Sequence, residues 1–141
     1  MKREILHFSE IQVRFNEADP LGIVWHGHYI QYFEDGRESF GKQFGISYLD
    51  VYKNGFTTPI VKVVCDYKKP LRYGDTILIE TKYIPSDAAK LEFTYKLFKK
   101  ESGELVATGS TTQIFLDKVH SELQLFNPPF FLEWKKDNDC V

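Results

Sequence analysis

Residues 15–29 of this chain read FNEADPLGIVWHGHY, in which a carboxylate-bearing turn leads through a short apolar segment to two histidines. Asp19, Pro20 and Gly22 are turn-forming residues, so a turn interrupts the strand-like pattern before them. His26 follows Asp19 by seven residues and stands where a helical pattern begins. A helix N-terminus presents unpaired N–H groups and a positive dipole end, which suit an oxyanion. A carboxylate held beside such an end is half of an acyl-transfer site.

The residues around this stretch follow strand-like and helical patterns. Alternation over residues 9–15 predicts a strand, and helical spacing from about Tyr29 predicts a long helix. Gly36 lies inside this helix, where glycine costs about 1 kcal/mol relative to alanine, so we expect close packing against a sheet there. Gly45 is a typical C-terminal stop. The residues expected to share one face are Ile11, Val13 and Phe15 in the strand, and Ile30, Phe33, Arg37, Phe40 and Phe44 in the helix.

A second, short helix and several strands are predicted for the rest of the chain. Ser47 and Asp50 have the spacing of a capping box, which predicts a helix that ends near Gly55. Four strands follow, and the hairpin pattern at residues 101–104 favours a meander. Gly109 marks a possible bulge in the last strand. The predicted strands cover residues 60–67, 76–84, 91–97 and 105–116.

The domain organisation is simple. No linker or low-complexity segment divides the chain, so we expect one domain over residues 1–141. The sequence Asn-Pro-Pro at residues 127–129 is expected to end the regular part, and a short apolar tail follows. A long helix among antiparallel strands indicates the α+β class. Because one helix covers only one face of a curved sheet, exposed strand edges favour dimerisation.

Composition excludes several classes of protein. A hydrophobic content of 43% and a charged content of 27% are typical of soluble domains, and a net charge of −2 argues against a general nucleic-acid binder. Cys65 and Cys140 do not make a disulfide framework. No stretch approaches the roughly 18 apolar residues of a membrane span. Lys2 and Arg3 are followed by no apolar region typical of a secretory signal, so we expect a cytoplasmic protein.

Two motifs carry a resemblance to a known family. Residues 19–29, DPLGIVWHGHY, are followed by Phe-Glu at 33–34 and Arg-Glu at 37–38. This segment resembles the hot-dog-fold acyl-CoA thioesterases, above all the 4-hydroxybenzoyl-CoA thioesterase type and its relatives encoded with the Tol–Pal system. Their pattern is Asp-x-x-Gly-[Ile/Val]-Val-[Tyr/Trp]-[His/aromatic]-x-x-Tyr, leading into the central helix. Residues 67–75, YKKPLRYGD, are similar to the family's strand-to-turn segment, Tyr-x-x-Pro-x-x-x-x-Asp.

The resemblance implies both a fold and an assembly. The fold is the α+β hot-dog fold, in which a curved antiparallel sheet of about five strands wraps a long central helix. Two subunits pair into a dimer, often with further pairing to a tetramer, and the active site lies at the dimer interface. The implied substrate is an acyl-CoA, with neither a metal nor a separate cofactor.

Asp19 is the first candidate for a catalytic residue. A carboxylate can attack a thioester carbonyl and form a mixed anhydride, or it can deprotonate a water that attacks. The resemblance leaves both routes open. The alternative is structural, since Asp before Pro often begins a turn and has no further role.

His26 is the second candidate. It aligns with the helix-entry residue whose backbone N–H points at the thioester oxygen in the family, and its imidazole is also suited to a hydrogen bond with Asp19 or to proton transfer. The alternative is a helix-entry histidine without a chemical role. The residues predicted to line the substrate site are Val24, Trp25, Gly27 and Tyr29.

Other polar residues near this stretch suggest alternatives. Asp19, His26 and His28 offer metal-ligating atoms, but the beginning of a helix would not place both imidazoles on one side, so no metal is expected. Glu34 and Glu38 are rival carboxylates, because a second branch of hot-dog thioesterases carries its catalytic Glu on the central helix. Their i, i+4 spacing with Arg37 nearby is typical of a solvated helix face.

The predicted function is hydrolysis of an acyl-CoA to a carboxylic acid and free CoA. A hot-dog dehydratase or hydratase acting on acyl-CoA or acyl-carrier protein is the alternative enzyme. A non-catalytic acyl-CoA-binding module is the alternative outside catalysis, although such a module would not need a carboxylate beside the thioester. Acyl-chain identity, the choice between CoA and carrier protein, and the choice between dimer and tetramer stay open.

Overall fold

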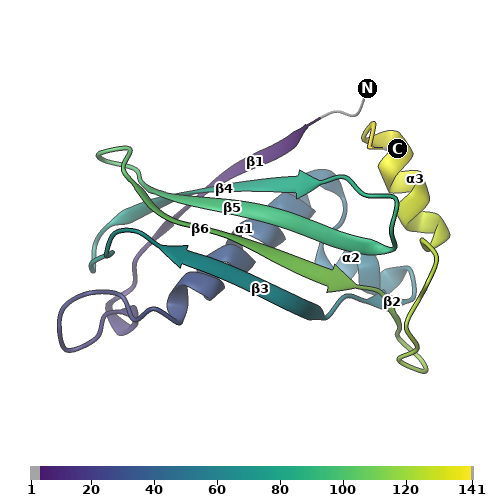
Figure 1. The fold of residues 1–141 in the computed structure, drawn as a ribbon, viewed down its shortest axis with the longest axis horizontal. Coiled ribbons are helices and arrows are strands. Elements are labelled where there is room, and N and C mark those ends of the chain that lie inside the picture. Colours follow the sequence, from purple (N-terminus) through teal and green to yellow (C-terminus); the bar gives the residue numbers. More distant parts are fainter. Residues whose placement is uncertain (1–3, 141) are drawn as a thin grey trace.

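Five antiparallel strands form the main sheet, in the spatial order β1-β4-β5-β6-β3 (Figure 1). This computed structural model describes residues 4–140, so the prediction concerning Lys2 and Arg3 lies outside the described residues. In sheet order, the strands are β1 (Ile5–Gln12), β4 (Thr76–Ile84), β5 (Lys90–Lys99), β6 (Leu105–Ile114) and β3 (Ile60–Tyr67).

The long helix α1 (His28–Phe44) packs on one face of this sheet (Figure 1). This architecture confirms the predicted α+β hot-dog fold with a central helix and a five-stranded antiparallel sheet. None of the helices in the described residues is long and apolar enough to cross a membrane. The shorter elements are η1 (Phe15–Glu17), α2 (Tyr48–Lys53), the two-stranded pair β2 (Phe56–Thr57) and β7 (Leu116–Asp117), and α3 (Pro129–Asp137).

Small residues let α1 approach the sheet closely. A Cβ added to Gly36 would lie 2.6 Å from both Ile79 Cγ2 and Thr81 Oγ1 on β4, which confirms the close packing predicted there. The buried face of the helix differs from the predicted stripe, because Ile30 and Phe44 are only partly buried. The fully or nearly fully buried residues of α1 are Tyr29, Tyr32, Phe33, Gly36, Phe40 and Gly41.

Gly109 forms no bulge, contrary to the prediction. It pairs in register with Cys65 on β3 and with Tyr95 on β5. A Cβ at this position would lie 2.3 Å from the ring of Phe33, which itself stacks on Tyr95 at a centroid distance of 4.6 Å. The glycine therefore makes room for an aromatic residue of α1 and does not change the register of the strand.

The strand order corrects the predicted four-strand meander. Only β4, β5 and β6 follow one another in space, whereas β3 pairs with β6 at the far edge of the sheet. The connection over residues 68–75 therefore crosses the sheet before β4 begins. Strand adjacency depends on long-range pairing, which the strand pattern of the sequence does not specify.

Both ends of the described chain also differ from prediction. The first strand covers Ile5–Gln12 and not residues 9–15, and Phe15 lies in η1 with 79% of its surface exposed. The predicted apolar tail is the helix α3, which begins with Pro129 in its first turn. Trp134 anchors α3 because its indole N–H donates to the carbonyl oxygen of Phe44 at 2.8 Å.

Local stop and cap signals behave as predicted. Gly45 ends α1 in the left-handed conformation at φ 75°. The hydroxyl of Ser47 accepts a hydrogen bond from the N–H of Asp50, and the carboxylate of Asp50 accepts one from the N–H of Ser47 at 3.0 Å. This reciprocal capping box begins α2.

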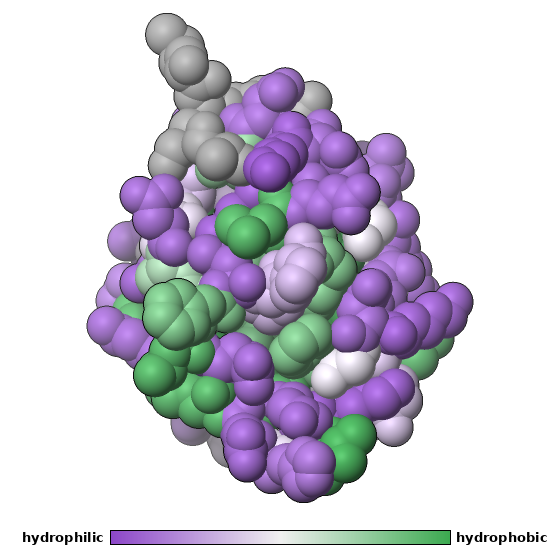
Figure 2. Space-filling model, turned by 90° about the vertical axis from the view of Figure 1, so that its right-hand side faces the viewer, coloured by the Kyte–Doolittle hydropathy of each residue, from purple (hydrophilic) through white to green (hydrophobic). Residues whose placement is uncertain are grey.

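Apolar side chains reach the surface at one end of the molecule. Figure 2 shows this end, on the right in Figure 1, with apolar residues among polar ones. Phe126 is 86% exposed there, in the segment between β7 and α3. The loop that precedes α1 lies at the opposite end of the sheet (Figure 1), so these residues are remote from it.

Candidate active site

Asp19 lies in a tight turn between η1 and α1. Its N–H donates to the carbonyl oxygen of Ile23 at 2.8 Å, and its carbonyl oxygen accepts from the N–H of Gly22 at 2.9 Å. Gly22 has a φ of 81°, a conformation that favours glycine. The carboxylate oxygen Oδ1 accepts from the N–H of Leu21 at 2.9 Å. The turn therefore orients the carboxylate through one oxygen and leaves Oδ2 outside this bond.

Backbone hydrogen bonds attach the residues after this turn to the rest of the domain. The N–H of Val24 donates to the carbonyl oxygen of Leu71 at 2.7 Å, and the N–H of Trp25 donates to that of Glu17 at 3.1 Å. Val24 and Leu71 are both buried. These contacts hold the loop against the segment that connects β3 to β4, and they fix where α1 begins.

The helix begins at His28, within one residue of the predicted start of the helical pattern at about Tyr29 and two residues after His26, and Gly27 is its N-cap residue. The N–H of His28 donates to the carbonyl oxygen of Trp25 at 3.0 Å, and the N–H of Tyr29 donates to that of His26 at 3.3 Å. Within residues 4–140 no hydrogen bond engages the N–H groups of His26 and Gly27. These two groups are therefore the available donors at the helix entry.

A pocket of about 320 Å³ joins the Asp19 turn to the helix entry. It brings together five of the six predicted site residues, and Gly27 lies behind the indole of Trp25. A Cβ at Gly27 would be 2.2 Å from that ring, so glycine is required for the indole to occupy this position. The lining residues are Asp19, Ile23, Val24, Trp25, His26, Tyr29, Tyr67, Lys68, Lys69 and Pro70.

The pocket includes residues that site prediction missed, at the end of β3. Tyr67 donates its hydroxyl hydrogen to the carbonyl oxygen of His26 at 2.8 Å, and its ring packs against Tyr29 at a centroid distance of 4.9 Å. Burial and the neighbouring Cys65 raise the pKa of Tyr67 to about 12, so the phenol stays protonated at neutral pH. The second family motif begins at Tyr67 and was the available signal for this contribution.

Glu17 joins the segment before Asp19 to α1 through hydrogen bonds, and it was not predicted as a functional residue. Its carboxylate is buried and accepts hydrogen bonds from the Arg14 N–H at 2.8 Å, from Arg14 Nη1 at 2.9 Å and from the Tyr32 hydroxyl at 3.0 Å. Burial disfavours the carboxylate, but these hydrogen bonds outweigh it and lower the pKa of Glu17. A charged Glu17 therefore ties the chain before Asp19 to α1.

Replacing Glu17 with glutamine is expected to lower the free energy of unfolding by about 1–2 kcal/mol at pH 7, as charge-assisted hydrogen bonds are lost. Because the folded pKa lies below the ordinary value of 4.5, the stabilisation is present above that value and disappears as pH falls through the folded pKa. Urea titrations at pH 7, 4 and 3 measure this difference. The exposed Glu133 gives the control E133Q, and a wild-type-to-variant difference that does not shrink in acid would contradict the assignment.

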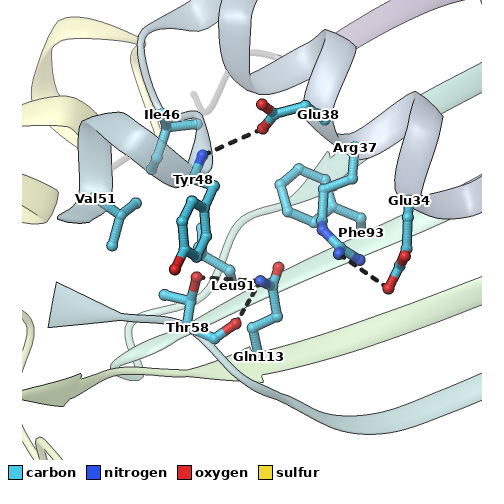
Figure 3. A pocket seen from close by; sticks show the side chains of 10 residues that line it. All are labelled: Glu34, Arg37, Glu38, Ile46, Tyr48, Val51, Thr58, Leu91, Phe93 and Gln113. Atoms are coloured by element: carbon cyan, nitrogen blue, oxygen red, sulfur yellow. Dashed lines mark hydrogen bonds and ion pairs between the residues drawn. The ribbon is translucent and has the colours of Figure 1, made fainter. Parts of the chain in front are cut away.

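The alternative site residues lie apart from Asp19. Glu34 is 55% exposed and pairs with Arg37 at 3.8 Å, and Glu38 accepts from the N–H of Tyr48 at 3.2 Å. Both line a second pocket, between α1, α2 and the sheet (Figure 3). The Nδ1 atom of His28 is hydrogen-bonded to the side-chain oxygen of Gln31 at 2.9 Å. Within residues 4–140, no three side chains of the metal-ligating types His, Cys, Asp and Glu form a cluster.

Comparisons with known proteins identify the family and the fold of this chain. The sequence profile of the thioesterase-like superfamily matches residues 13–134. The putative acyl-CoA thioesterase YneP of Bacillus subtilis (strain 168) is 36% identical over 115 residues, which cover 80% of this chain and 83% of that protein. The solved DHNA-CoA thioesterase of Staphylococcus aureus has a TM-score of 0.84 at 27% identity and covers 94% of this chain and 89% of its own. The 4-hydroxybenzoyl-CoA thioesterase of Pseudomonas sp. strain CBS-3 shares the fold, with a TM-score of 0.78 at 20% identity and coverage of 92% and 98%.

Proposed function

The chain belongs to the thioesterase-like superfamily of thioester hydrolases, and from this premise we propose that it hydrolyses an acyl-CoA to a carboxylic acid and free CoA at the Asp19 pocket. The observation that carries the proposal is the presence, in the lining of one pocket, of Asp19 and of His26, whose N–H group is not engaged in a hydrogen bond within the described residues. A base or nucleophile and an oxyanion donor are the two groups that thioester hydrolysis requires.

Two reaction routes fit this arrangement. In the first, Asp19 removes a proton from a water whose oxygen bonds to the thioester carbon, and the N–H of His26 stabilises the oxyanion. Collapse of this intermediate breaks the C–S bond, and the thiolate takes the proton from Asp19. In the second, Asp19 bonds to the carbon directly and expels the thiolate, and water then hydrolyses the mixed anhydride. Both routes use the same carboxylate and the same donor.

Two lysines that line this pocket are suited to bind the phosphate groups of CoA. Lys68 and Lys69 are exposed and line the pocket directly after β3. Lysine side chains pair with phosphate oxygens as mobile point charges. This placement supports a thioester whose nucleotide end lies over residues 68–69 while the acyl carbonyl reaches the helix entry.

The direct test is a hydrolysis panel of short-chain, long-chain and aromatic acyl-CoA thioesters. We expect release of free thiol, detected with a chromogenic thiol reagent, for at least one class. In parallel, loss of enoyl absorbance from an enoyl-CoA measures hydratase activity. Enoyl conversion without thiol release would overturn the proposal in favour of a dehydratase or hydratase, and binding without any turnover would favour a binding module.

We also propose that the protein forms a homodimer through β3. This strand pairs with β6 on one side only, so its other side presents unpaired backbone groups. Three of its valines are at least 38% exposed, which is unusual for apolar residues on a strand of a monomer. Because Tyr67 and the pocket lie at the end of the same strand, a partner across β3 would approach the active site. The exposed valines are Val61, Val63 and Val64.

Replacing Val63 with aspartate is expected to convert the dimer to monomer, because a two-fold axis through β3 brings the two new charges close together. Sedimentation velocity at several protein concentrations measures the change. The matched control is L6D on β1, the opposite edge of the sheet, where Leu6 is 38% exposed, close to the 39% of Val63. Equal loss of dimer in both variants, or a monomeric wild type, would contradict assembly through β3.

A further inference from the structure

Within the described residues, the backbone of His26 is hydrogen-bonded to only one other element of the fold. Its N–H group makes no hydrogen bond, and its carbonyl oxygen accepts two. One comes from the N–H of Tyr29, three residues further along the same segment, at 3.3 Å. The other comes from the hydroxyl group of Tyr67, at the end of β3, at 2.8 Å. The bond from Tyr67 is the shorter of the two, and it joins His26 to the sheet.

Tyr67 is held in place by the strand and by its neighbours. It is the last residue of β3 and pairs with Ala107 on β6. Its ring meets the ring of Tyr29 at a centroid distance of 4.9 Å and the imidazole of His26 at 6.2 Å, edge to face in both cases. The thiol of Cys65, two residues earlier on the same face of the strand, lies beside the hydroxyl group. The end of β3 therefore carries this phenol to the loop that precedes α1 (Figure 1).

Tyr29 gives the ring of Tyr67 a fixed surface to pack on. It is 3% exposed, and its hydroxyl group donates to the carbonyl oxygen of Lys69 at 3.3 Å. The same hydroxyl accepts from the N–H of Leu71 at 3.2 Å. The phenol of Tyr29 is thus engaged with the segment after β3. Tyr67 is the member of this aromatic pair whose hydroxyl group binds the helix entry.

The position of His26 matters because its N–H is the oxyanion donor of the proposed function, on which this inference rests. A backbone N–H is not aimed by its own side chain, and a misplacement of about 1 Å in an active site can cost 100-fold in rate. His26 precedes α1, which begins at His28, so the regular hydrogen bonds of the helix do not fix it. A bond from the sheet to the carbonyl oxygen of the same residue fixes where its N–H lies relative to Asp19.

We propose that Tyr67 is a positioning residue for thioester hydrolysis, whose hydroxyl group holds the carbonyl oxygen of His26 and thereby keeps the N–H of His26 directed at the thioester oxygen. Tyr67 acts through His26 and transfers no proton to the substrate. Because burial and Cys65 raise the pKa of Tyr67 to about 12, its hydroxyl group stays a donor across the working pH range of an enzyme. A positioning role and a proton-transfer role therefore predict different pH profiles.

The variant Y67F removes the hydroxyl group and keeps the ring. We expect kcat to fall about tenfold, less than the roughly 100- to 1,000-fold typical of a lost oxyanion donor, because the N–H is still present but less well placed. KM should stay within about twofold of wild type, since the oxyanion forms only in the transition state. The pH profile of kcat/KM should keep its shape. The matched control Y73F removes an exposed phenol from the segment after β3 and should leave kcat within about twofold.

A second variant separates the hydroxyl group from the ring. Y67L removes both and should lower kcat at least as much as Y67F does. Wild-type kcat in Y67F would overturn the proposal, whether or not Y67L loses activity, because the ring alone would then be responsible. A changed shape of the pH profile in Y67F would overturn it in favour of proton transfer by Tyr67. Circular dichroism checks that each variant is folded.

NMR tests the positioning without any substrate. The amide proton of Gly27 shares a peptide group with the carbonyl of His26, and a hydrogen bond to that carbonyl polarises the whole group. We therefore expect the Gly27 amide proton to move upfield in Y67F and to stay in place in Y73F. If the wild type hydrolyses no thioester, the proposed function fails, and this shift still shows whether Tyr67 holds His26. Unchanged amide resonances of His26 and Gly27 in Y67F would overturn the inference even where hydrolysis is found.

Discussion

Replacing Asp19 with asparagine is expected to lower kcat for thioester hydrolysis by at least about 100-fold, because the amide is neither a base nor a nucleophile. The fold should persist. Asparagine retains an oxygen that can accept the hydrogen bond from the Leu21 N–H, which the Asp19 carboxylate accepts at 2.9 Å. Steady-state kinetics with the best thioester of the panel measure the effect.

The matched control is D137N, which removes an exposed carboxylate at the end of α3. It should leave kcat within about twofold of wild type, since surface substitutions away from a site have small effects. Circular dichroism and sedimentation show whether D19N keeps its fold and assembly. If folded D19N hydrolyses the thioester at nearly the wild-type rate, Asp19 is not the catalytic carboxylate, and Glu34 or Glu38 becomes the candidate.

Replacing Gly109 with alanine is expected to lower the free energy of unfolding by about 2 kcal/mol, within the range typical of overpacked cores. The added Cβ would lie 2.3 Å from the Phe33 ring and 2.5 Å from the carbonyl oxygen of Val64. The ring is itself confined by its stacking on Tyr95. Because backbone lies on one side and a packed ring on the other, the strand and α1 must separate slightly. Urea denaturation measures the loss.

The neighbouring variant S110A is the control, because it changes the same strand without adding atoms. A double-mutant cycle with F33L tests the mechanism. If the clash with Phe33 causes the loss, G109A should cost less in the F33L background than in the wild type, with a coupling of about 0.5 kcal/mol or more. Additive effects would show that strain in the strand, and not contact with α1, is responsible.

Local sequence patterns predicted the two longer stretches of helix and strand that surround the Asp19 turn, and the short helix α2. The capping box at Ser47 and Asp50 and the C-terminal glycine Gly45 act within one or two helical turns, so neighbouring residues suffice to specify them. The Asp19 turn is equally local. Five residues of the family motif line one pocket, because they lie close together along the chain.

Contacts between distant residues were decided by the tertiary structure. Pairing of β3 with β6, the contribution of Tyr67 to the pocket and the packing of Phe33 against Gly109 each join residues at least 40 positions apart. Apolar periodicity predicts that a residue is buried, but it does not predict which distant residue packs against it. The helix α3 was missed because its apolar residues are packed by distant partners, such as the Phe44 carbonyl that binds Trp134.

The sequence by itself determined the family, the order of most elements and the carboxylate at the helix entry. Only the tertiary structure showed that the helix begins two residues after His26, which leaves two N–H groups unengaged, and that residues of α1, α2 and the sheet line a second pocket. The physical reason is how far apart along the chain the interacting residues lie. Turns and caps depend on hydrogen bonds between near neighbours, whereas a pocket depends on which surfaces meet when the sheet closes around the helix.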